Sequence, residues 1–334
     1  MQPIKRWTVR PAGSNWGDFG ADDQIGRLNL ITPKRRRAAV AEVREGIAFT
    51  LSLPLDHPKG EGIEPGLRNP PRLSSTPIGH NHKVWPTVND IACNDAVTMT
   101  LQFSTQWDGL CHMGAMFDAD GNGTPAACYY NGYRAHAHVI GSSTGDITPQ
   151  AKKLGIETMA VTGVQGRGVL VDLFSVCGEE RVAVGYDPFM RALEAQRVQP
   201  EAGDILCLYT GLGDLILNLG DQLTAARIHA SCAALDGFDE RLLRWIDESQ
   251  IAAIAADNTG VENWTGNTDA PGGIALPLHH LCLFKLGVPL GELWYLSELA
   301  AWLKLHQRNR FLLTAPPLRL PGAVGSPVTP VATV

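Results

Sequence analysis

Several kinds of segment are missing from this sequence of 334 residues, and each absence excludes a class of protein. No apolar run approaches the ~20 residues that a membrane-spanning helix needs. The first residues, Met1 to Trp7, lack the apolar stretch of a secretory signal. The seven cysteines are scattered without a Cys-x-x-Cys pair, which argues against a disulfide framework or a zinc ribbon. We therefore expect a cytoplasmic protein with reduced thiols and no membrane partner.

Basic charge and cofactor-binding motifs are also scarce. The net charge is −6, and the basic run Arg35 to Arg37 falls in a predicted helix, so no nucleic-acid partner is expected. The sequence contains no Walker A motif, no Gly-x-Gly-x-x-Gly and no His-Glu-x-x-His, which leaves nucleotide-binding and zinc-protease functions without support. We expect a small-molecule substrate and no organic cofactor.

The apolar patterns predict an α/β protein whose strand order the sequence does not fix. Residues 1–60 are predicted to form an N-terminal wrap, and residues 54–95 a long loop with seven prolines that contains His80 and His82. In the wrap, Thr32 and Pro33 begin a predicted helix that ends before Gly46. Strands are predicted at 47–53, 98–103, 168–176, 204–210 and 251–256, and helices at 188–197, 239–249, 276–286 and 292–305.

A group of polar residues follows the strand predicted at Thr98 to Phe103. It consists of Gln102, Gln106, Asp108 and His112, whose spacing past a strand end lets them converge on one point, as a metal site or an acid–base centre requires. The alternative is that Asp108 caps a turn and His112 packs in the core. Cys111 lies between them, and its apolar neighbours predict a buried thiol.

The same segment resembles the His-x-Gly-Thr-His-x-Asp-x-x-x-His signature of the cyclase family, which includes bacterial kynurenine formamidases and isatin hydrolase. Gln102 and Gln106 stand at its first two histidines, whereas Thr105, Asp108 and His112 match. Further similar segments follow in family order over roughly residues 7 to 330: Asn15-Trp16-Gly17, Asp22 to Gly26, Leu28 to Pro33, Tyr130-Asn131-Gly132, Arg167 to Leu170, Asp257-Asn258 with Glu262, Pro277-Leu278-His279, Gly291-Glu292 and Gly325-Ser326-Pro327. The resemblance implies one cyclase-like domain over residues 1–334, a swivelling β/β/α fold whose barrel-like mixed sheet is flanked by helices.

The resemblance also implies a downstream half of the site, made by a histidine and Glu292. We favour His279 because of its Pro-Leu-His context and its thirteen-residue spacing from Glu292, and His280 is the alternative. Without a site, both histidines would pack a helix, and Glu292 would begin the next helix, where the dipole favours a carboxylate.

Two glutamines in place of histidines change the expected metal. Glutamine offers an amide oxygen, so a set of Gln102, Gln106, Asp108 and Glu292 would be all oxygen and would suit Mn²⁺, Mg²⁺ or Ca²⁺ better than Zn²⁺. An alternative set of Asp108, His112, His280 and Glu292 would suit zinc. A third possibility is that the metal is lost and the polar side chains form a hydrogen-bonding site.

If the family chemistry is kept, the protein is a hydrolase that opens a small cyclic amide or lactone, or cleaves an N-acyl, formamide-like C–N bond. A metal would activate water, His112 and His279 would be the general base and acid, and Asp108 the central ligand. Trp107, Tyr130 and Trp264 could form an aromatic wall for the substrate. The alternatives are a metal-free lyase or isomerase and a non-catalytic binding protein.

Two further expectations concern a motif and the assembly. The segment Gly141 to Gly145 matches the serine-hydrolase pattern Gly-x-Ser-x-Gly, but a turn rather than a helix follows it, so a nucleophile at Ser143 is not expected. The long proline-rich loop and an extended C-terminal segment, together with the resemblance, predict a homodimer or homotetramer.

Overall fold

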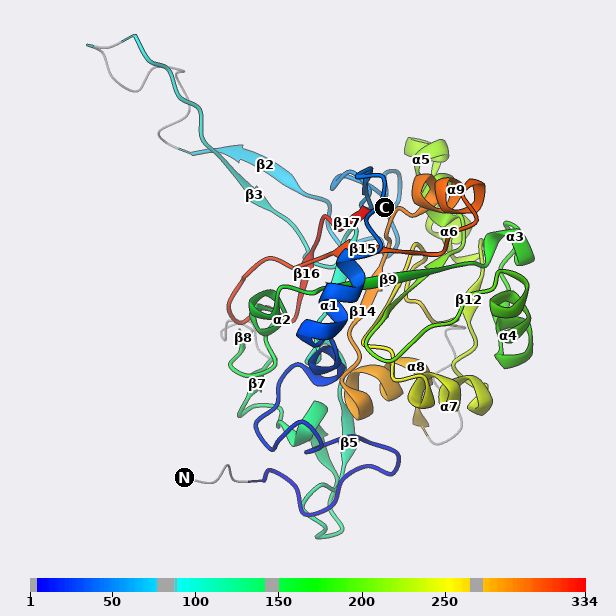
Figure 1. Ribbon diagram of the computed structural model, residues 1–334. Helices are drawn as coiled ribbons and strands as arrows, with labels where there is room; N and C mark the ends of the chain where they lie inside the picture. The colour runs from blue at the N-terminus through cyan, green and yellow to red at the C-terminus, as the bar shows by residue number, and fades with distance from the viewer. Residues whose placement is uncertain (1–4, 77–86, 88, 142–149, 265–272) are drawn as a thin grey trace.

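A curled mixed sheet of nine strands forms the centre of the computed structural model, which describes residues 5–76, 87, 89–141, 150–264 and 273–334 (Figure 1). The strand order is β1-β17-β15-β9-β11-β13-β14-β4-β16. The four strands β9, β11, β13 and β14 are parallel, and the strands on either side of them pair antiparallel. The nine strands are β1 Ala48–Thr50, β4 Gln106–Asp108, β9 Gln165–Asp172, β11 Ile205–Tyr209, β13 Ala253–Ala256, β14 Leu290–Glu292, β15 Arg310–Thr314, β16 Gly325–Pro327 and β17 Val331–Thr333.

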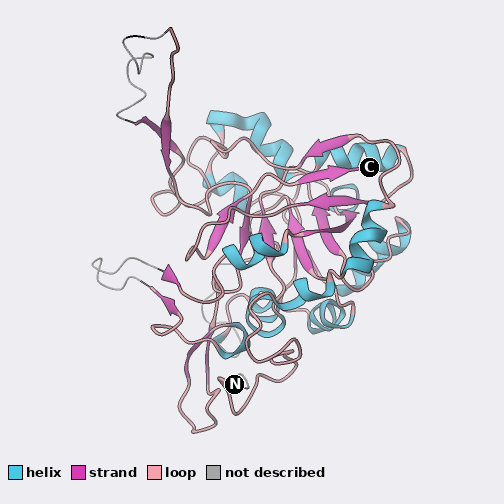
Figure 2. Cartoon of the chain, turned by 60° about the vertical axis from the view of Figure 1, so that its left-hand side comes forward, coloured by secondary structure: helices cyan, strands magenta, loops and turns pink. Residues whose placement is uncertain are grey.

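Shorter elements surround this sheet (Figure 2). Among the described residues, four strand pairs lie outside it: β2 Arg72–Ser75 with β3 Asp95–Thr98, β5 Ala115–Phe117 with β6 Ala126–Cys128, β7 Val139–Ile140 with β8 Gln150–Ala151, and β10 Ala183–Val184 with β12 Ala234–Leu235. The helices are α1 Pro33–Val40, α2 Glu157–Thr162, α3 Phe174–Cys177, α4 Tyr186–Ala195, α5 Leu212–Leu219, α6 Ala225–His229, α7 Glu240–Glu248, α8 Pro277–His279 and α9 Ser297–Leu305, with the 3₁₀ turns η1 Gly26–Leu30, η2 Tyr130–Gly132 and η3 Gly220–Gln222 and the π-helix η5 His280–Leu286.

The sheet carries a hydrophobic core on each face, because its central strands contain apolar runs that are buried on both sides. Alternate residues of β9 belong to different cores, Val169 and Val171 to one and Leu170 to the other. Helices α4 and α7 pack into the first core, whereas α9 packs into the second. A parallel sheet that is covered on both sides requires such continuous apolar runs, so the strands predicted at 168–176, 204–210 and 251–256 are confirmed within a few residues.

The first long helix begins where the sequence predicts it. The hydroxyl of Thr32 accepts a hydrogen bond from the backbone N–H of Arg35 at 3.3 Å, and Pro33 occupies the first helical position. The helix ends at Val40, six residues before Gly46, because the chain turns after it. The N–H of Gly46 then donates to the carbonyl of Val334, the residue after the last strand.

Two predicted elements near the polar residues are wrong. No strand spans Thr98 to Phe103: β3 ends at Thr98, a turn follows, and the next strand is β4. No helix begins at Glu292 either, because residues 290–292 form β14, and α9 starts at Ser297. In both cases the pairing of β4 with β14 and β16 decides the structure, and these partners lie far apart in the chain. Local patterns contain no information on such partners.

The segment before α1 wraps around the end of the chain's π-helix. Gly26 and Gly287 both have positive φ angles, and a side chain on either would collide with the backbone of the other. The N–H of Arg27 donates to the carbonyl of Gly287 at 2.8 Å, and the buried guanidinium of Arg27 donates to the carbonyl of Ile246 at 2.9 Å. These contacts fix the wrap against α7 and η5.

A two-stranded arm, β2 with β3, extends away from the body of the molecule (Figure 1). All eight of its strand residues are exposed.

His80, His82 and Ser143, which the sequence singles out, lie outside the described residues. No helix in the described part of the chain is both long enough and apolar enough to cross a bilayer.

Candidate active site

The strand pair β4–β14 brings three polar side chains together. Gln106 lies opposite Glu292, and Asp108 lies opposite Leu290. Because side chains alternate along a strand, Gln106 and Asp108 project from one face of β4 while Trp107 projects from the other. The motif residue Thr105 holds this strand in place, since its hydroxyl donates to the carbonyl of Leu293 and accepts from the N–H of Leu53 at 2.9 Å.

Oxygen atoms without hydrogen-bond partners mark this face of β4. Both carboxylate oxygens of Asp108 and the amide oxygen of Gln106 are buried and accept no hydrogen bond. The amide nitrogen of Gln106 donates to Glu292 Oε2 at 2.9 Å. Since an ionised carboxylate can only accept, this contact fixes the amide and leaves its oxygen free. Buried acceptors without donors are costly in free energy, so a cation is the natural partner for this group.

His279 completes the cluster from the end of α8. Single ligand atoms of Asp108, His279 and Glu292 lie within 4.8 Å of one another, the spacing that one metal ion requires. His279 Nε2 is 3.7 Å from Glu292 Oε1, and its Nδ1 is 2.8 Å from Glu262 Oε2. The hydrogen bond from Nδ1 to a carboxylate directs Nε2 toward the other two residues, as around many metal-ligating histidines.

The buried charges of the cluster depend on one another. Burial raises the pKa of Asp108 to about 6, and the nearby charge of Glu292 adds to the shift. Burial alone would lower the pKa of His279, but Glu262 and Glu292 outweigh it and raise that pKa well above the ordinary value. Burial likewise opposes ionisation of Glu292, yet His279 and Arg68 lower its pKa. In the absence of a cation, both pKa shifts favour a protonated His279 beside an ionised Glu292.

A cavity of about 240 Å³ opens onto the cluster. Glu262, His279 and Glu292 form one part of its wall. His112 also lines it, with its Nδ1 3.8 Å from Asp108 Oδ1 and its side chain partly exposed. The remaining lining among the described residues is Ile63, Glu64, Arg68, Met113, Arg181, His229, Thr259, Gly260, Trp264 and Leu276. His112 thus lies between the carboxylate cluster and the space that a substrate would occupy.

Of the three aromatic residues that the sequence predicts as a substrate wall, only Trp264 lines the cavity, where it is half exposed. Trp107 is fully buried on the opposite face of β4, packs edge-on against Trp294 and donates to the carbonyl of Ala315 at 2.8 Å. Tyr130 is also fully buried, and its hydroxyl donates to Asp23 Oδ2 at 3.0 Å. The predictions for Trp107 and Tyr130 are wrong because both rings stabilise the core.

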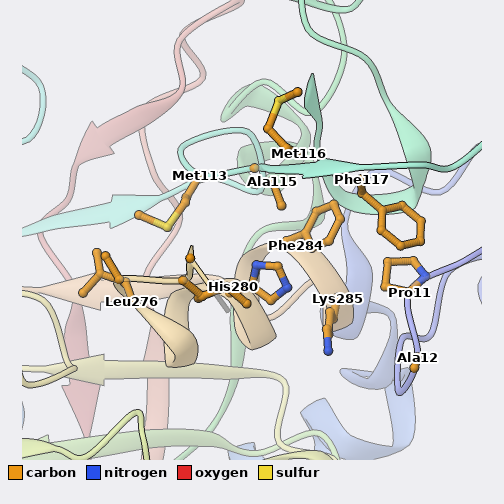
Figure 3. Close-up of a pocket in the computed structure, with 14 residues that line it drawn as sticks. Pro11, Ala12, Met113, Ala115, Met116, Phe117, Leu276, His280, Phe284 and Lys285 are labelled. Carbon is orange, nitrogen blue, oxygen red and sulfur yellow. The ribbon is translucent and has the colours of Figure 1, made fainter. Parts of the chain in front are cut away.

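His280 faces away from the cluster. It lines a second cavity of about 670 Å³, where its ring lies 4.9 Å from that of Phe284 and near Lys285 and Met113 (Figure 3). Burial and the charge of Lys285 lower its pKa to about 4. The alternative metal set with His280 is therefore not assembled, because successive residues of the α8–η5 helix point in different directions.

The all-oxygen metal set is only partly assembled. Gln106, Asp108 and Glu292 are together, but the structure adds the imidazole of His279. Gln102 lies in the turn before β4, with its amide nitrogen buried against Gly325 and without a hydrogen-bond partner. Among the described residues, Asp108, His279 and Glu292 could therefore hold a metal, with Gln106 beside them.

Other residues of the site have no clear signal in the sequence. Arg68, from the proline-rich loop, donates to Glu64 Oε2 at 2.7 Å and to the carbonyl of Gln102 at 2.9 Å, and it lies 3.7 Å from Glu292. Arg181 lines the cavity from the segment before β10. Neither belongs to a motif or a periodic pattern, so only the folded chain places them here. Cys111 is buried as predicted, and burial raises the pKa of its thiol to about 12.

Comparison with known proteins agrees with the resemblance seen in the sequence. The model of the Cyclase family ("Putative cyclase") matches residues 51–263. The crystal structure of a protein described as a novel cyclase aligns with a TM-score of 0.77 at 34% sequence identity, over 96% of this chain and 99% of that chain. The chain belongs to the Cyclase family.

More distant structures share the fold. Isatin hydrolase A from Ralstonia solanacearum aligns with a TM-score of 0.55 at 16% identity, over 88% of this chain and 93% of that chain. Isatin hydrolase A from Labrenzia aggregata, bound to benzyl benzoate, aligns with a TM-score of 0.56 at 14% identity, over 89% and 95% of the two chains. A search of curated proteins found no match. The predicted α/β fold, with a barrel-like mixed sheet flanked by helices, is confirmed.

Proposed function

We propose that this protein is a hydrolase of a small cyclic amide, lactone or N-acyl compound, with one divalent metal ion held by Asp108, His279 and Glu292. The observation that carries the proposal is the set of buried oxygens of Asp108 and Gln106 that face His279 and Glu292 without a donor. The shared fold of the isatin hydrolases supports the reaction class. Gln106 would add its amide oxygen as a fourth ligand.

A divalent metal in this position supplies Lewis-acid polarisation of a carbonyl and a lowered pKa for water. His112 lies beside the cluster and partly in the cavity, where its imidazole can accept a proton from water and return it to the leaving nitrogen or oxygen. His279 is better suited to metal binding than to proton transfer, because Glu262 holds its Nδ1 and directs its Nε2 into the cluster. Trp264 offers an apolar face for a flat substrate.

The donor set favours a hard cation. Three oxygens and a single imidazole suit Mn²⁺ or Mg²⁺ better than zinc, whose tight sites in proteins are richer in nitrogen and sulfur. We therefore propose manganese or magnesium as the resident ion. We also place the protein in the cytoplasm, since the five buried cysteines are free thiols: Cys111, Cys128, Cys207, Cys232 and Cys282.

The decisive experiment combines metal analysis with a substrate screen. Elemental analysis of protein purified without a chelator should show Mn or Mg near one ion per chain. Isatin, N-formylkynurenine and simple lactones are then assayed with added Mn²⁺, Mg²⁺ or Zn²⁺. Asp108→Asn should abolish both metal retention and hydrolysis, whereas Asp221→Asn, at an exposed aspartate, should change neither. Tight stoichiometric zinc would overturn the metal assignment.

Two other functions are outcomes of the same experiment. A chain that binds no metal and yet loses activity in His112→Gln would be a metal-free lyase or isomerase. A chain that transforms no substrate and binds no metal would be a binding protein on this fold. Metal retention that is unchanged in Asp108→Asn would contradict the placement of the site itself.

A further inference from the structure

In the described part of the cavity wall, Arg181 is a cation without a carboxylate partner. Arg181 Nε donates to the side chain of Asn263 at 2.8 Å, but one terminal nitrogen of its guanidinium, Nη1, is buried and has no hydrogen-bond acceptor. Among the described residues, no carboxylate lies within ion-pair distance of Arg181. A buried N–H without an acceptor is costly, and more so when it carries charge. The position therefore suits an anion that arrives with a ligand.

The other basic side chains in the described part of this cavity wall already have hydrogen-bond or ion-pair partners. Arg68 contacts Glu64 and Glu292 and donates to a backbone carbonyl. His279 lies between Glu262 and Glu292. His229 has its Nε2 3.2 Å from the carbonyl of Ile63. In the described part of the cavity wall, Arg181 is thus the charged side chain with a buried N–H group that lacks an acceptor.

We propose that Arg181 binds a carboxylate of the substrate, so that the protein acts on small anionic compounds. The inference rests on the proposed hydrolase function, because the same cavity joins Arg181 to the His279–Glu292 side of the cluster. A volume of about 240 Å³ equals that of roughly eight water molecules. The ligand is therefore compact: about one ring, which carries a carboxylate at one end and the reacting carbonyl at the other.

Charge complementarity supports this orientation. The carboxylates Asp108 and Glu292 would repel an anionic group and attract a metal, whereas the guanidinium of Arg181 attracts an anion. A substrate carboxylate would thus be directed to Arg181 and kept away from the cluster. A guanidinium N–H bound to a carboxylate is among the stronger protein hydrogen bonds, so one such contact can select anionic over neutral substrates.

Ligand binding without turnover gives the first test. The protein is treated with EDTA, so that no metal can hold the ligand, and titrated with benzoate and with its neutral isostere benzamide. Benzoate should bind more tightly than benzamide. Arg181→Met should weaken benzoate binding by about ten- to a hundredfold, the usual loss for a hydrogen bond to a charged group, and Arg181→Lys should retain part of the affinity. Arg191→Met, at an exposed arginine of α4, should leave it unchanged.

The inference requires that the carboxylate is already present in the substrate and is not formed only by the reaction. A matched pair of substrates tests this requirement. In the metal-loaded enzyme, Arg181→Met should raise KM for 2-formamidobenzoate and leave KM for 2-formamidobenzamide unchanged. The inference is overturned if benzoate does not bind the wild type, or if Arg181→Met binds it as the wild type does while remaining folded. An equal effect on both substrates would also overturn it. Failure of the hydrolase proposal would be seen instead as unchanged metal retention in Asp108→Asn, whatever the benzoate titration shows.

Discussion

Glu262 is the residue on which the orientation of the cluster depends. Its two oxygens accept hydrogen bonds from the backbone N–H of Leu278 at 2.8 Å, from the N–H of His279 at 3.1 Å and from the imidazole of His279 at 2.8 Å. The carboxylate therefore fixes both the start of the helix and the ring of its last residue. Gly237 leaves room for it, since a methyl group there would collide with Glu262.

We predict that Glu262→Gln weakens metal binding by about ten- to a hundredfold, the usual cost of losing such an outer partner. The amide keeps the shape of the side chain but replaces one acceptor with a donor that faces backbone N–H groups. Titration of the EDTA-treated protein with Mn²⁺ by calorimetry measures the change. Glu248→Gln, at an exposed glutamate at the end of α7, is the matched control. An unchanged affinity in Glu262→Gln would mean that His279 is not a ligand.

The sequence identifies the residues of the cluster better than their partners. Asp108 and Glu292 can be recognised because family motifs preserve their neighbours, and the Pro-Leu-His context distinguishes His279 from His280. The roles of Arg68 and Arg181 cannot be predicted, since each depends on a loop whose course is set by distant contacts. Trp107 illustrates the opposite error. Its place in the motif suggests a site residue, but strand alternation turns it into the core.

Among the structural elements, α1, β9 and β15 are joined by one carboxylate at the end of a loop. Glu201 lies 2.7 Å from Arg35, 2.9 Å from Arg167 and 3.1 Å from Arg310. The hydrogen bond from Arg35, followed by those from Arg167, lowers the pKa of Glu201 to about 2. Since the pKa is lowered in the folded state, the contribution to stability is complete above the ordinary value near 4.5 and is lost as the pH falls toward 2.

We predict that Glu201→Gln lowers the free energy of unfolding at pH 7 by about 1 kcal/mol or less, because the pairs are partly exposed to solvent. The difference from the wild type should shrink as the pH falls from 4.5 to 2. Urea denaturation at a series of pH values measures it. Glu248→Gln should show no such dependence. A difference that stays constant to pH 2 would mean that charge pairing does not hold these elements.

The central strands can be predicted from the sequence, but the strands that carry the site cannot. β11 and β13 are apolar throughout, and β9 contains the apolar run Val169, Leu170 and Val171, so the burial of these strands is evident from composition. β4 and β14 have three residues each and contain Gln106, Asp108 and Glu292, which have no preference for strands. They become strands only because the edge of the sheet supplies partners for them.

At the scale of the whole molecule, the exposed arm calls for a partner. Leu73 on β2 is 76% exposed and Val97 on β3 is 51% exposed. An isolated two-stranded hairpin is only marginally stable in water, and exposed apolar residues that cluster on a projection mark contact surfaces. We propose that a second copy of this chain covers the arm, in a homodimer or homotetramer.

The expected mass in solution is therefore a multiple of 36.0 kDa. Light scattering coupled to size-exclusion chromatography measures it. Leu73→Asp combined with Val97→Asp should shift the mass toward that of one chain. Leu305→Asp, at a similarly exposed leucine in the last turn of α9, should not. A wild-type protein that is monomeric at micromolar concentration would contradict the proposal.

In the sheet, β4 lies between β14 and β16, which come much later in the chain, and this order affects biosynthesis. Gln106 and its partner Glu292 are separated by 186 positions, and β16, on the other side of β4, lies still later. A growing chain on the ribosome therefore exposes β4 long before either neighbour has been made. The cluster is assembled only after Glu292 has been made, so chains released early would have neither the cluster nor its cavity.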